Sequence, residues 1–399
     1  MSYDAIVVGG GLAGSVLADQ LARAGRDVLV LERETRFKDR VRGENMLPWG
    51  VAAAKRLGIH DELVRAGGHA SPNLVMVTMG QLAPPRDMRV TTPGGDAMLN
   101  MYHPDLQETL LARAASSGAE VMRGATVLAV DSGPDRLLAV TFEYKGLRQT
   151  LSSRIVVGAD GRASLMRSWA GFAVQRNPDL LTIAGTLLSG TDVPDDSTYL
   201  CIGPGIASFW APLGQQRSRV YFIYPGVAGR RSLSGKAKVA EFLQAVQSVG
   251  VPRDWLANAE ADGPLAEFDG ADRWVETPAK HGVALVGDAA ASSDPSWGSG
   301  LSLTLLDVEH LANALRATDD WDAALAQYAR QHDDYYGALH RILSWMTELV
   351  WSAGPEADDR RARVFPRMMT DPRGFPDAAG QGPFGPSDEQ ARRLILGLE

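Results

Sequence analysis

The chain has 399 residues, a formal net charge of −8 and a composition that is 45% hydrophobic and 22% charged. This composition is ordinary for a globular protein of two or three domains, and it excludes a disordered chain or a collagen-like repeat. The acidic balance argues against a nucleic-acid partner, and a single cysteine excludes an intrachain disulfide and a cysteine-based metal cluster. Because no apolar run reaches the roughly 18 residues of a membrane span, we expect a cytoplasmic protein without membrane contact or bound metal.

The first residues carry a dinucleotide-binding fingerprint. A short apolar run at residues 3–9 is typical of a buried parallel strand, and a predicted helix follows to about residue 24. Between them the sequence matches GxGxxG: the first glycine permits a tight turn, the second lets the backbone approach a pyrophosphate, and the third lets helix and strand pack closely. The helix N-terminus then presents free N–H groups to the phosphates. The residues predicted to bind the dinucleotide here are Gly9, Gly11, Leu12, Ala13 and Gly14.

A second apolar strand is predicted at residues 27–31, and Glu32 stands at its end. The carboxylate of Glu32 is placed to accept hydrogen bonds from a ribose 2′-hydroxyl and would repel a 2′-phosphate. This favours FAD or NAD over NADP at this position. Arg33 is a further candidate for contact with the cofactor.

Four further segments decide between FAD and NAD. They are residues 40–50, residues 103–110 at the start of a helix, residues 154–167 with a strand and an Asp-Gly turn, and residues 283–300 with a Gly-Asp pair and a P-x-x-G-x-G stretch. Together with the fingerprint, and in this order, they resemble the group A FAD-dependent monooxygenases, the single-component aromatic hydroxylases similar to p-hydroxybenzoate hydroxylase. The resemblance spans residues 1 to about 320.

The resemblance implies roles for residues in these segments. In this family the Asp-Gly turn supports both FAD and the nicotinamide donor, the Gly-Asp pair hydrogen-bonds the flavin ribityl chain, and the P-x-x-G-x-G stretch lies beside the flavin ring. The glycines leave room for a planar ring, and the helix that follows aims its positive end at the ring. The cofactor-binding residues implied by these segments are Asp160, Gly161, Gly287, Asp288, Gly298, Gly300 and Leu301.

Two positions near the flavin carry alternatives. The family often has an arginine near the FAD phosphates; Arg42 falls there, with Arg40 as a competing candidate and an ion pair between Arg42 and Glu44 as the structural alternative. The family commonly has an arginine or glutamine where His103 stands. We therefore expect Gln107, one helical turn further on, to assist in binding the cofactor.

Residues 71–100 and 176–275 are predicted to form an antiparallel sheet that holds the substrate over the flavin. Strand-like runs occur at residues 73–79, 181–188, 207–212 and 220–224, separated by glycine and proline. Tyr224 is the candidate for orienting a phenolic substrate, with Tyr221 as an alternative that the sequence does not separate from it. The other candidates for the pocket wall are Phe209, Trp210 and Phe222, for each of which an ordinary core position is the competing interpretation.

The whole pattern predicts an α/β fold. A Rossmann-like FAD-binding domain of the glutathione-reductase type takes residues 1–70, 101–175 and 276–320, and the inserted sheet takes the two segments between them. Residues 321–399 form a helical C-terminal region, with helical periodicity over residues 320–352. After Gly354 the chain is rich in proline, glycine and charge, so we expect irregular structure until a short helix at residues 389–396.

The implied function is a monooxygenase. NADPH or NADH reduces FAD, dioxygen forms a flavin hydroperoxide, and one oxygen is transferred to an aromatic or polyketide-like small molecule. The cofactor carries this chemistry, so the residues expected at the reacting centre are few: Pro295, Gly298 and Tyr224. Only one dinucleotide fingerprint is complete, so we expect the nicotinamide donor to visit a groove of the FAD domain and leave. The chain is expected to be a monomer or homodimer.

Three other functions share the same scaffold. One is a flavin-dependent reductase of isoprenoid double bonds, whose family shares the Arg-Gly-Glu sequence at residues 42–44. Another is a flavin-dependent halogenase, although residues 208–212 do not match the W-x-W-x-I-P stretch of those enzymes. The third is a non-enzymatic FAD-binding regulator. Alkene reduction, halogenation or absence of turnover would distinguish these from hydroxylation.

Overall fold

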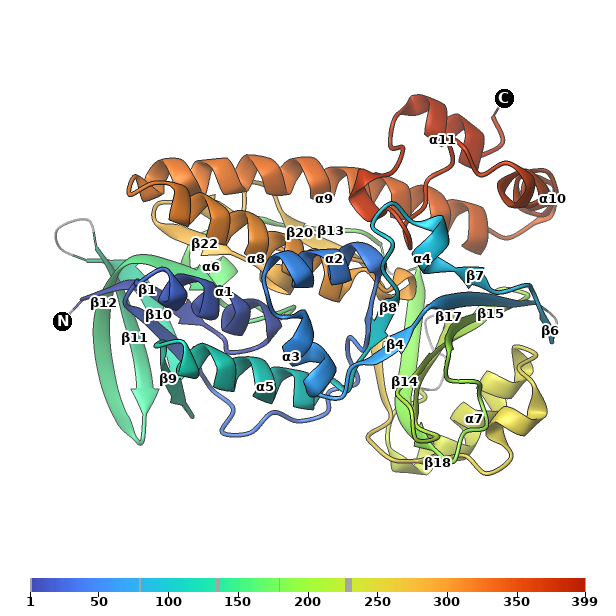
Figure 1. Ribbon diagram of the computed structural model, residues 1–399, viewed down its shortest axis with the longest axis horizontal. Helices are drawn as coiled ribbons and strands as arrows, with labels where there is room; N and C mark the ends of the chain where they lie inside the picture. The colour runs from blue at the N-terminus through green and yellow to red at the C-terminus, as the bar shows by residue number, and fades with distance from the viewer. Residues whose placement is uncertain (1, 79, 134–136, 179, 227–231, 399) are drawn as a thin grey trace.

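The computed structural model describes residues 2–78, 80–133, 137–178, 180–226 and 232–398. Figure 1 shows two large sheets toward opposite ends of the molecule, with the helices α8 (Gly300–Ala317) and α9 (Trp321–Trp351) lying along one side. The expected α/β class, with a second sheet and a helical C-terminal region, is confirmed.

The first sheet has a parallel core. Its strands run in the order β9, β2, β1, β12 and β22, with the bounds Glu120–Arg123, Val28–Glu32, Ser2–Val8, Leu147–Gly158 and Val283–Leu285. Both faces of β2, β22, the second half of β1 and the end of β12 are covered, which explains their continuous apolar sequence; Ala5, Ile6 and Val7 are fully buried. The carboxyl ends of β1, β2, β12 and β22 meet at one edge of the sheet, where doubly wound folds bind their ligands.

Antiparallel strands extend this sheet beyond β12. β10 (Thr126–Ser132) and β11 (Leu138–Tyr144) form a hairpin that pairs with the first half of β12, and β21 (Ala279–Lys280) pairs with β22. A cluster around the fully buried Val140, Phe142 and Val156 packs one face of this region. The hairpin lies at the far end of the molecule from the second sheet (Figure 1).

The second sheet confirms the strands predicted at residues 181–188, 207–212 and 220–224. Among the described residues it contains, besides the short β18 and β19, the strands β14, β17, β16, β15, β5, β6 and β7, with the bounds Leu181–Ser189, Ser218–Pro225, Ile206–Pro212, Ser197–Gly203, Asn73–Thr78, Gln81–Leu82 and Arg86–Asp87. β18 spans Glu260–Ala261 and β19 spans Ala266–Asp269. All these pairings are antiparallel except that of β5 with β15. The strand predicted at 73–79 is described to Thr78, and Met79 lies outside the described residues.

The two faces of this sheet differ, because successive side chains of a strand point to opposite sides. One face packs under α7 (Val239–Ser248) and carries a closed aromatic core with Tyr199, Trp210, Phe222 and Tyr224. The opposite face carries Tyr221 and faces the segment around Val41. This segment belongs to the half of the molecule that is built on the first sheet and is predicted to bind the cofactor, called the cofactor half below.

Two small sheets and several short helices complete the fold. β3 (Asn45–Met46) and β4 (His69–Ser71) flank β8 (Met98–Asn100), and β20 (Arg273–Val275) lies between β13 (Val174–Arg176) and β23 (Ala291–Ser292). The remaining helices before α7 are α1, α2, α3, α4, α5 and α6, at Leu12–Arg23, Pro48–Arg56, His60–Arg65, Met88–Thr91, His103–Ser116 and Met166–Trp169. The domain boundary predicted between residues 70 and 71 falls inside β4, and the proposed division into domains stays a prediction.

The C-terminal region is more helical than the sequence indicated. The helices predicted at 320–352 and 389–396 are present as α9 and α11 (Glu389–Ile395). The expectation of irregular structure after Gly354 is wrong, because α10 spans Pro355–Thr370. Proline is favoured in the first turn of a helix, where no N–H partner is needed, and Arg361 binds the carbonyl oxygens of Leu349 and Ser352 at the end of α9. None of the helices in the described part of the chain combines the length and apolar character needed to cross a bilayer.

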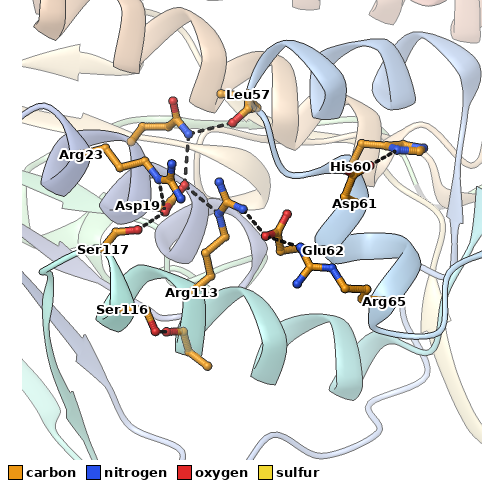
Figure 2. Close-up of polar contacts among 12 residues, drawn as sticks. Asp19, Arg23, Leu57, His60, Asp61, Glu62, Arg65, Arg113, Ser116 and Ser117 are labelled. Atoms are coloured by element: carbon orange, nitrogen blue, oxygen red, sulfur yellow. Dashed lines mark hydrogen bonds and ion pairs between the residues drawn. The ribbon is translucent and has the colours of Figure 1, made fainter.

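A buried ionic network holds α1 against α5 and α3 (Figure 2). Asp19 on α1 is 1% exposed and accepts hydrogen bonds from Arg23, Arg113 and Ser117 at 2.9, 3.0 and 2.6 Å. Arg113 also pairs with Glu62 on α3 at 2.6 Å. Burial alone would raise the pKa of Asp19, but these hydrogen bonds outweigh it and hold the pKa below its ordinary value.

We expect Asp19→Asn to lower the free energy of unfolding by about 3 kcal/mol at neutral pH, because it removes the buried carboxylate that Arg23 and Arg113 share. Urea denaturation measures this loss. The stabilisation is present above the ordinary pKa of aspartate, so the difference between wild type and variant should shrink as pH falls through the lowered pKa of the folded state. The control is Asp61→Asn, whose side chain is 89% exposed; equal losses in the two variants would contradict this prediction.

Candidate active site

The glycine-rich turn joins β1 to α1 with very close backbone contacts. A Cβ atom on Gly14 would stand 1.9 Å from the carbonyl oxygen of Gly9, and Gly9 itself has a φ of +104°. Gly11 extends the chain into α1, and no side chain caps the first turn of this helix. Its N–H groups are therefore available to an anionic group, as expected for the phosphates of a dinucleotide. Leu12 and Ala13 lie in this first turn.

The acidic residue at the end of β2 lies where the sequence placed it. Glu32 is 6% exposed and accepts hydrogen bonds from the N–H groups of Gly10 and Glu34, both at 2.7 Å. Arg33 is exposed and pairs with Glu34 at 3.7 Å, at the rim of the site. Gln107 lies on the other side of the turn, with its Nε2 atom 3.2 Å from the Cβ position of Gly11. Glu32 and Gln107 thus flank the same turn.

Asp160 forms the corner after β12. One carboxylate oxygen accepts hydrogen bonds from the N–H groups of Leu165 and Met166, at 2.8 and 3.2 Å, and so fixes the start of α6. Its Oδ1 atom is buried and has no hydrogen-bond partner within the described residues. Gly161, with a φ of +77°, has nothing within 4 Å of its Cβ position. The Asp-Gly turn therefore borders open space, and the Oδ1 atom of Asp160 is available there to accept a hydrogen bond.

The Gly-Asp turn after β22 is held by two residues from distant segments. The N–H of Gly287 donates to Asp307 on α8 at 2.7 Å, and Arg167 donates to the carbonyl oxygens of Asp288 and Ala289. Arg167 therefore has a structural role, because it fixes the carbonyl groups of this turn. Burial raises the pKa of Asp288, although the charges of Arg162, Arg42 and Arg167 oppose this.

The P-x-x-G-x-G stretch lies against the segment that begins at Arg42. The Cβ position of Gly298 is 3.5 Å from Asn45 Oδ1, and that of Gly43 is 3.1 Å from the side chain of Leu301. Pro295 begins a short 3₁₀ turn that precedes α8. α8 starts with no side-chain cap and no acidic residue in its first turn, so its positive end faces this region.

His103 joins the same neighbourhood through its ring. Its Nδ1 atom lies 3.0 Å from the carbonyl oxygen of Gly43. Burial and the charges of Arg219 and Arg42 lower the pKa of His103. Of the two arginines considered near the phosphates, Arg40 is taken up by an ion pair with Glu34, whereas Arg42 is close enough to act on both His103 and Asp288.

These residues fit a bound FAD. The positions of Gly11, Gly161, Gly298 and Gly300 leave a cradle that side chains would narrow, since their Cβ atoms would meet at most one neighbouring atom within 4 Å. Two uncapped helix starts, the Glu32 carboxylate and the free oxygen of Asp160 border the cradle. The assignment of individual residues to parts of FAD remains a proposal. Within the described residues, no group of three or more His, Cys, Asp or Glu is placed to hold a metal ion.

A buried charged cluster connects the cofactor half to the second sheet. Arg219 on β17 is fully buried, and its guanidinium lies 2.8 Å from Asp39 and 3.1 Å from Glu44. The hydroxyl of Tyr221 donates a hydrogen bond to the other oxygen of Glu44. Burial raises the pKa of Glu44, and the charge of Arg219 and the Tyr221 hydrogen bond only partly offset this. The ion pair suggested between Arg42 and Glu44 is replaced by this cluster.

Aromatic side chains surround Tyr221 on the same face of the sheet. Phe209, Phe268 and Trp351 are half-buried there, and the ring of Phe268 meets that of Tyr221 edge to face at 6.3 Å. Tyr224 lies on the opposite face, 2% exposed and stacked on Phe222 at 5.1 Å. This placement removes Tyr224 from the expected substrate site, because its neighbours on β17 that face the cofactor half are Tyr221 and Arg219. Trp210 and Phe222 are core residues for the same reason.

Arg219, Asp39 and Arg162 were not predicted from the sequence as site residues. Arg219 had one usable signal: it is the only charged residue in the apolar run from Ser218 to Tyr224. A buried charge in such a strand requires a partner. Asp39 and Arg162 offered no comparable signal, because both occur in segments rich in charge or glycine.

Comparison with known proteins identifies the family of this chain. A family model described as "FAD binding domain" matches residues 2–332. Digeranylgeranylglycerophospholipid reductase 1 of Methanococcoides burtonii is 28% identical over 352 residues, covering 84% of this chain and 80% of the relative. Rifampicin monooxygenase of Streptomyces venezuelae is 28% identical over 369 residues, covering 89% and 73%.

Solved structures show the same fold. p-Nitrophenol 4-monooxygenase PnpA from Pseudomonas putida matches with a TM-score of 0.80 at 21% identity, covering 93% of this chain and 94% of that one. The flavin-dependent brominase Bmp2 matches with a TM-score of 0.78 at 16% identity, covering 100% and 98%. Relatives and structural neighbours with different named activities therefore share this architecture.

We expect Asp288→Ala to weaken FAD binding roughly ten- to hundredfold, since a hydrogen bond to a charged group contributes about 1.5–3 kcal/mol. Fluorescence titration of the apoprotein with FAD measures this. Asp262→Ala, which changes a half-exposed aspartate near the second sheet, should bind FAD as the wild type does. Unchanged FAD affinity in Asp288→Ala would remove this residue from the cofactor site.

Proposed function

The chain belongs to the FAD binding domain family, and we propose that it is a monooxygenase that uses NADPH or NADH and dioxygen to hydroxylate an aromatic or polyketide-like small molecule. The family makes it a flavoprotein oxidoreductase with FAD as its cofactor. The observation that carries the proposal is the Tyr221–Glu44 pair, set among half-buried aromatic side chains beside the cofactor segment. When bound, FAD would accept hydride from the donor and activate dioxygen.

The chain's own contribution is to position and activate the substrate. The rings of Phe209, Phe268 and Trp351 offer edges and faces to a planar ring. Electron-rich carbons of a phenol react better when the phenol has lost its proton. In this proposal Tyr221 accepts that proton and passes its own to Glu44, to which it is hydrogen-bonded, so the substrate becomes a phenolate and Glu44 becomes neutral. Arg219 holds the Glu44 carboxylate in place.

Incorporation of labelled oxygen tests the reaction class. The FAD-loaded protein, supplied with NADPH or NADH and a panel of phenols that includes p-nitrophenol, should consume dioxygen and place an atom of isotopically labelled dioxygen in the product. Mass spectrometry of the product measures this. Label that enters only from water, or a product formed equally well without dioxygen, would refute the proposed hydroxylation.

The proton pathway predicts distinct effects for two conservative variants. Tyr221→Phe and Glu44→Gln should each lower kcat by roughly 10²–10⁴, the usual contribution of a positioned acid or base, while FAD content stays at the wild-type level. Because the pKa of Glu44 is raised, wild-type activity should fall as pH drops through this raised value, and the dependence should vanish in Glu44→Gln. Phe222→Leu on the opposite face serves as control. A pH profile unchanged in Glu44→Gln would exclude Glu44 as the proton acceptor.

A second function is favoured by a specific observation. The relative from Methanococcoides burtonii is named as a reductase. Alkene reduction needs a proton together with a hydride, and the hydrogen-bonded Tyr221–Glu44 pair is a proton source beside the cofactor segment. Anaerobic incubation with reduced FAD and an isoprenoid alkene distinguishes the two. A monooxygenase leaves the alkene unchanged, whereas a reductase consumes it without dioxygen.

A further inference from the structure

A buried carboxylate on α8 lies behind the Gly-Asp turn. Asp307 is fully buried, and its Oδ2 atom accepts the hydrogen bond from the N–H of Gly287 at 2.7 Å. Its Oδ1 atom accepts a second hydrogen bond, from the hydroxyl of Tyr335 on α9, at 2.5 Å. Both oxygens therefore face a donor, an arrangement that suits an ionised carboxylate, because such a group can only accept hydrogen bonds.

The turn that Asp307 holds is packed between α8 and the first turn of α1. A Cβ atom on Gly287 would lie 3.1 Å from Oγ1 of Thr304 on α8 and 3.3 Å from the Cβ atom of Ala13 on α1. Gly287 has a φ of +60°, which favours glycine. The hydrogen bond to Asp307 therefore fixes Asp288, the next residue in the chain, relative to the helix start that is proposed to bind the phosphates.

The surroundings of Asp307 oppose its negative charge. Burial raises the pKa of Asp307 to about 6 and the charge of Asp288 adds to this, although His332 and the hydrogen bonds from Tyr335 and Gly287 lower it. The titratable side chains that act on this carboxylate or are acted on by it come from the turn and from α9: Asp288, Tyr328, His332 and Tyr335. On α8 itself, His310 stacks on the ring of Tyr335 with the ring centres 5.1 Å apart. A modest fall in pH is therefore enough to protonate Asp307.

We propose that Asp307 is a positioning residue for FAD, and that the chain holds FAD tightly only while this carboxylate is ionised. A hydrogen bond to a charged acceptor is roughly twice as strong as one between neutral groups, so an added proton weakens the hold on the N–H of Gly287. The turn is then held less firmly against α1, and FAD has to restore it on binding. The inference rests on the proposed placement of Asp288 at FAD, and it does not depend on the reaction that the bound cofactor performs.

Fluorescence titration of the apoprotein with FAD, at pH values above and below the pKa of about 6, tests this proposal. The dissociation constant should rise roughly tenfold as pH falls through this value, which is the difference in strength between a charged and a neutral hydrogen bond. In Asp307→Asn the affinity should be low at every pH and this dependence should disappear. Tyr335→Phe keeps the carboxylate but removes a hydrogen bond that lowers its pKa, so the loss of FAD should begin at a higher pH. The matched control is Tyr328→Phe on the same helix, whose hydroxyl donates to the carbonyl oxygen of Leu285 instead and should leave the midpoint unchanged.

Calorimetry of FAD binding near pH 6, in two buffers with different enthalpies of ionisation, measures the protons that binding releases. The wild type should release part of a proton for each FAD bound, because Asp307 is partly protonated in the free protein and ionised in the complex. Asp307→Asn should release less. Equal release in the two proteins would assign the titration to Asp288, His332 or His310 and overturn the proposal. A midpoint that does not move in Tyr335→Phe would also overturn it, and this variant decides alone if Asp307→Asn does not fold.

This proposal and the proposed reaction fail separately. Saturating FAD keeps the site filled at every pH, so the pH profile of turnover under that condition reports on Glu44 and not on Asp307. A protein whose FAD binding depends on pH as expected, but which incorporates no labelled oxygen, would refute the proposed monooxygenase and leave the role of Asp307 standing. Unchanged FAD affinity in Asp288→Ala would remove the turn from the cofactor site and overturn the role of Asp307 with it.

Discussion

The arrangement of the candidate active site depends on one buried ion cluster, in which Arg219 lies between Asp39 and Glu44. Separating a fully buried guanidinium from its carboxylate partners is strongly destabilising, since breaking a buried pair costs about 3–5 kcal/mol. These ion pairs therefore hold residues 39–44 of the cofactor half against β17 of the second sheet. The cluster thereby fixes the position of Gly43 relative to Tyr221. Gly43 lies beside His103 and Leu301, and Tyr221 faces the aromatic side chains.

The cofactor half could be predicted in detail because its sequence signals are local. Glycines at fixed spacing, an acid at a strand end and continuous apolar runs each have a direct physical cause, and the structure places Gly14, Glu32 and Asp288 in one region. The face of the second sheet that meets the cofactor half could not be predicted, because both faces of this sheet are covered. Val220, Phe222 and Tyr224 are as apolar as a substrate wall would be, so the alternation along β17 does not reveal which face meets the cofactor. The helix α10 was missed because its charge and proline content resemble those of a loop.

The two halves differ in what they are made of. The cofactor cradle is formed largely by backbone groups and glycine positions, and Arg167 supports it from behind through carbonyl oxygens. The opposing face is formed by side chains such as Phe209, Phe268 and Trp351. Side chains can be exchanged without altering the path of the chain. This division is compatible with the sharing of one architecture by relatives named as a reductase and a monooxygenase and by a structural neighbour named as a brominase.

The parallel sheet also sets the order in which the molecule can be completed during synthesis. The central strand β1 pairs with β12, about 150 residues later, and β12 in turn pairs with β22 near residue 284. The proposed cradle needs the turn at residues 9–14 together with residues 287–301. The ribosome must therefore synthesise about three quarters of the chain before the complete cradle can form. Pairings between such distant segments also form slowly. If the proposed cradle holds FAD, the cofactor is therefore captured late in synthesis, after β12 has paired with β22.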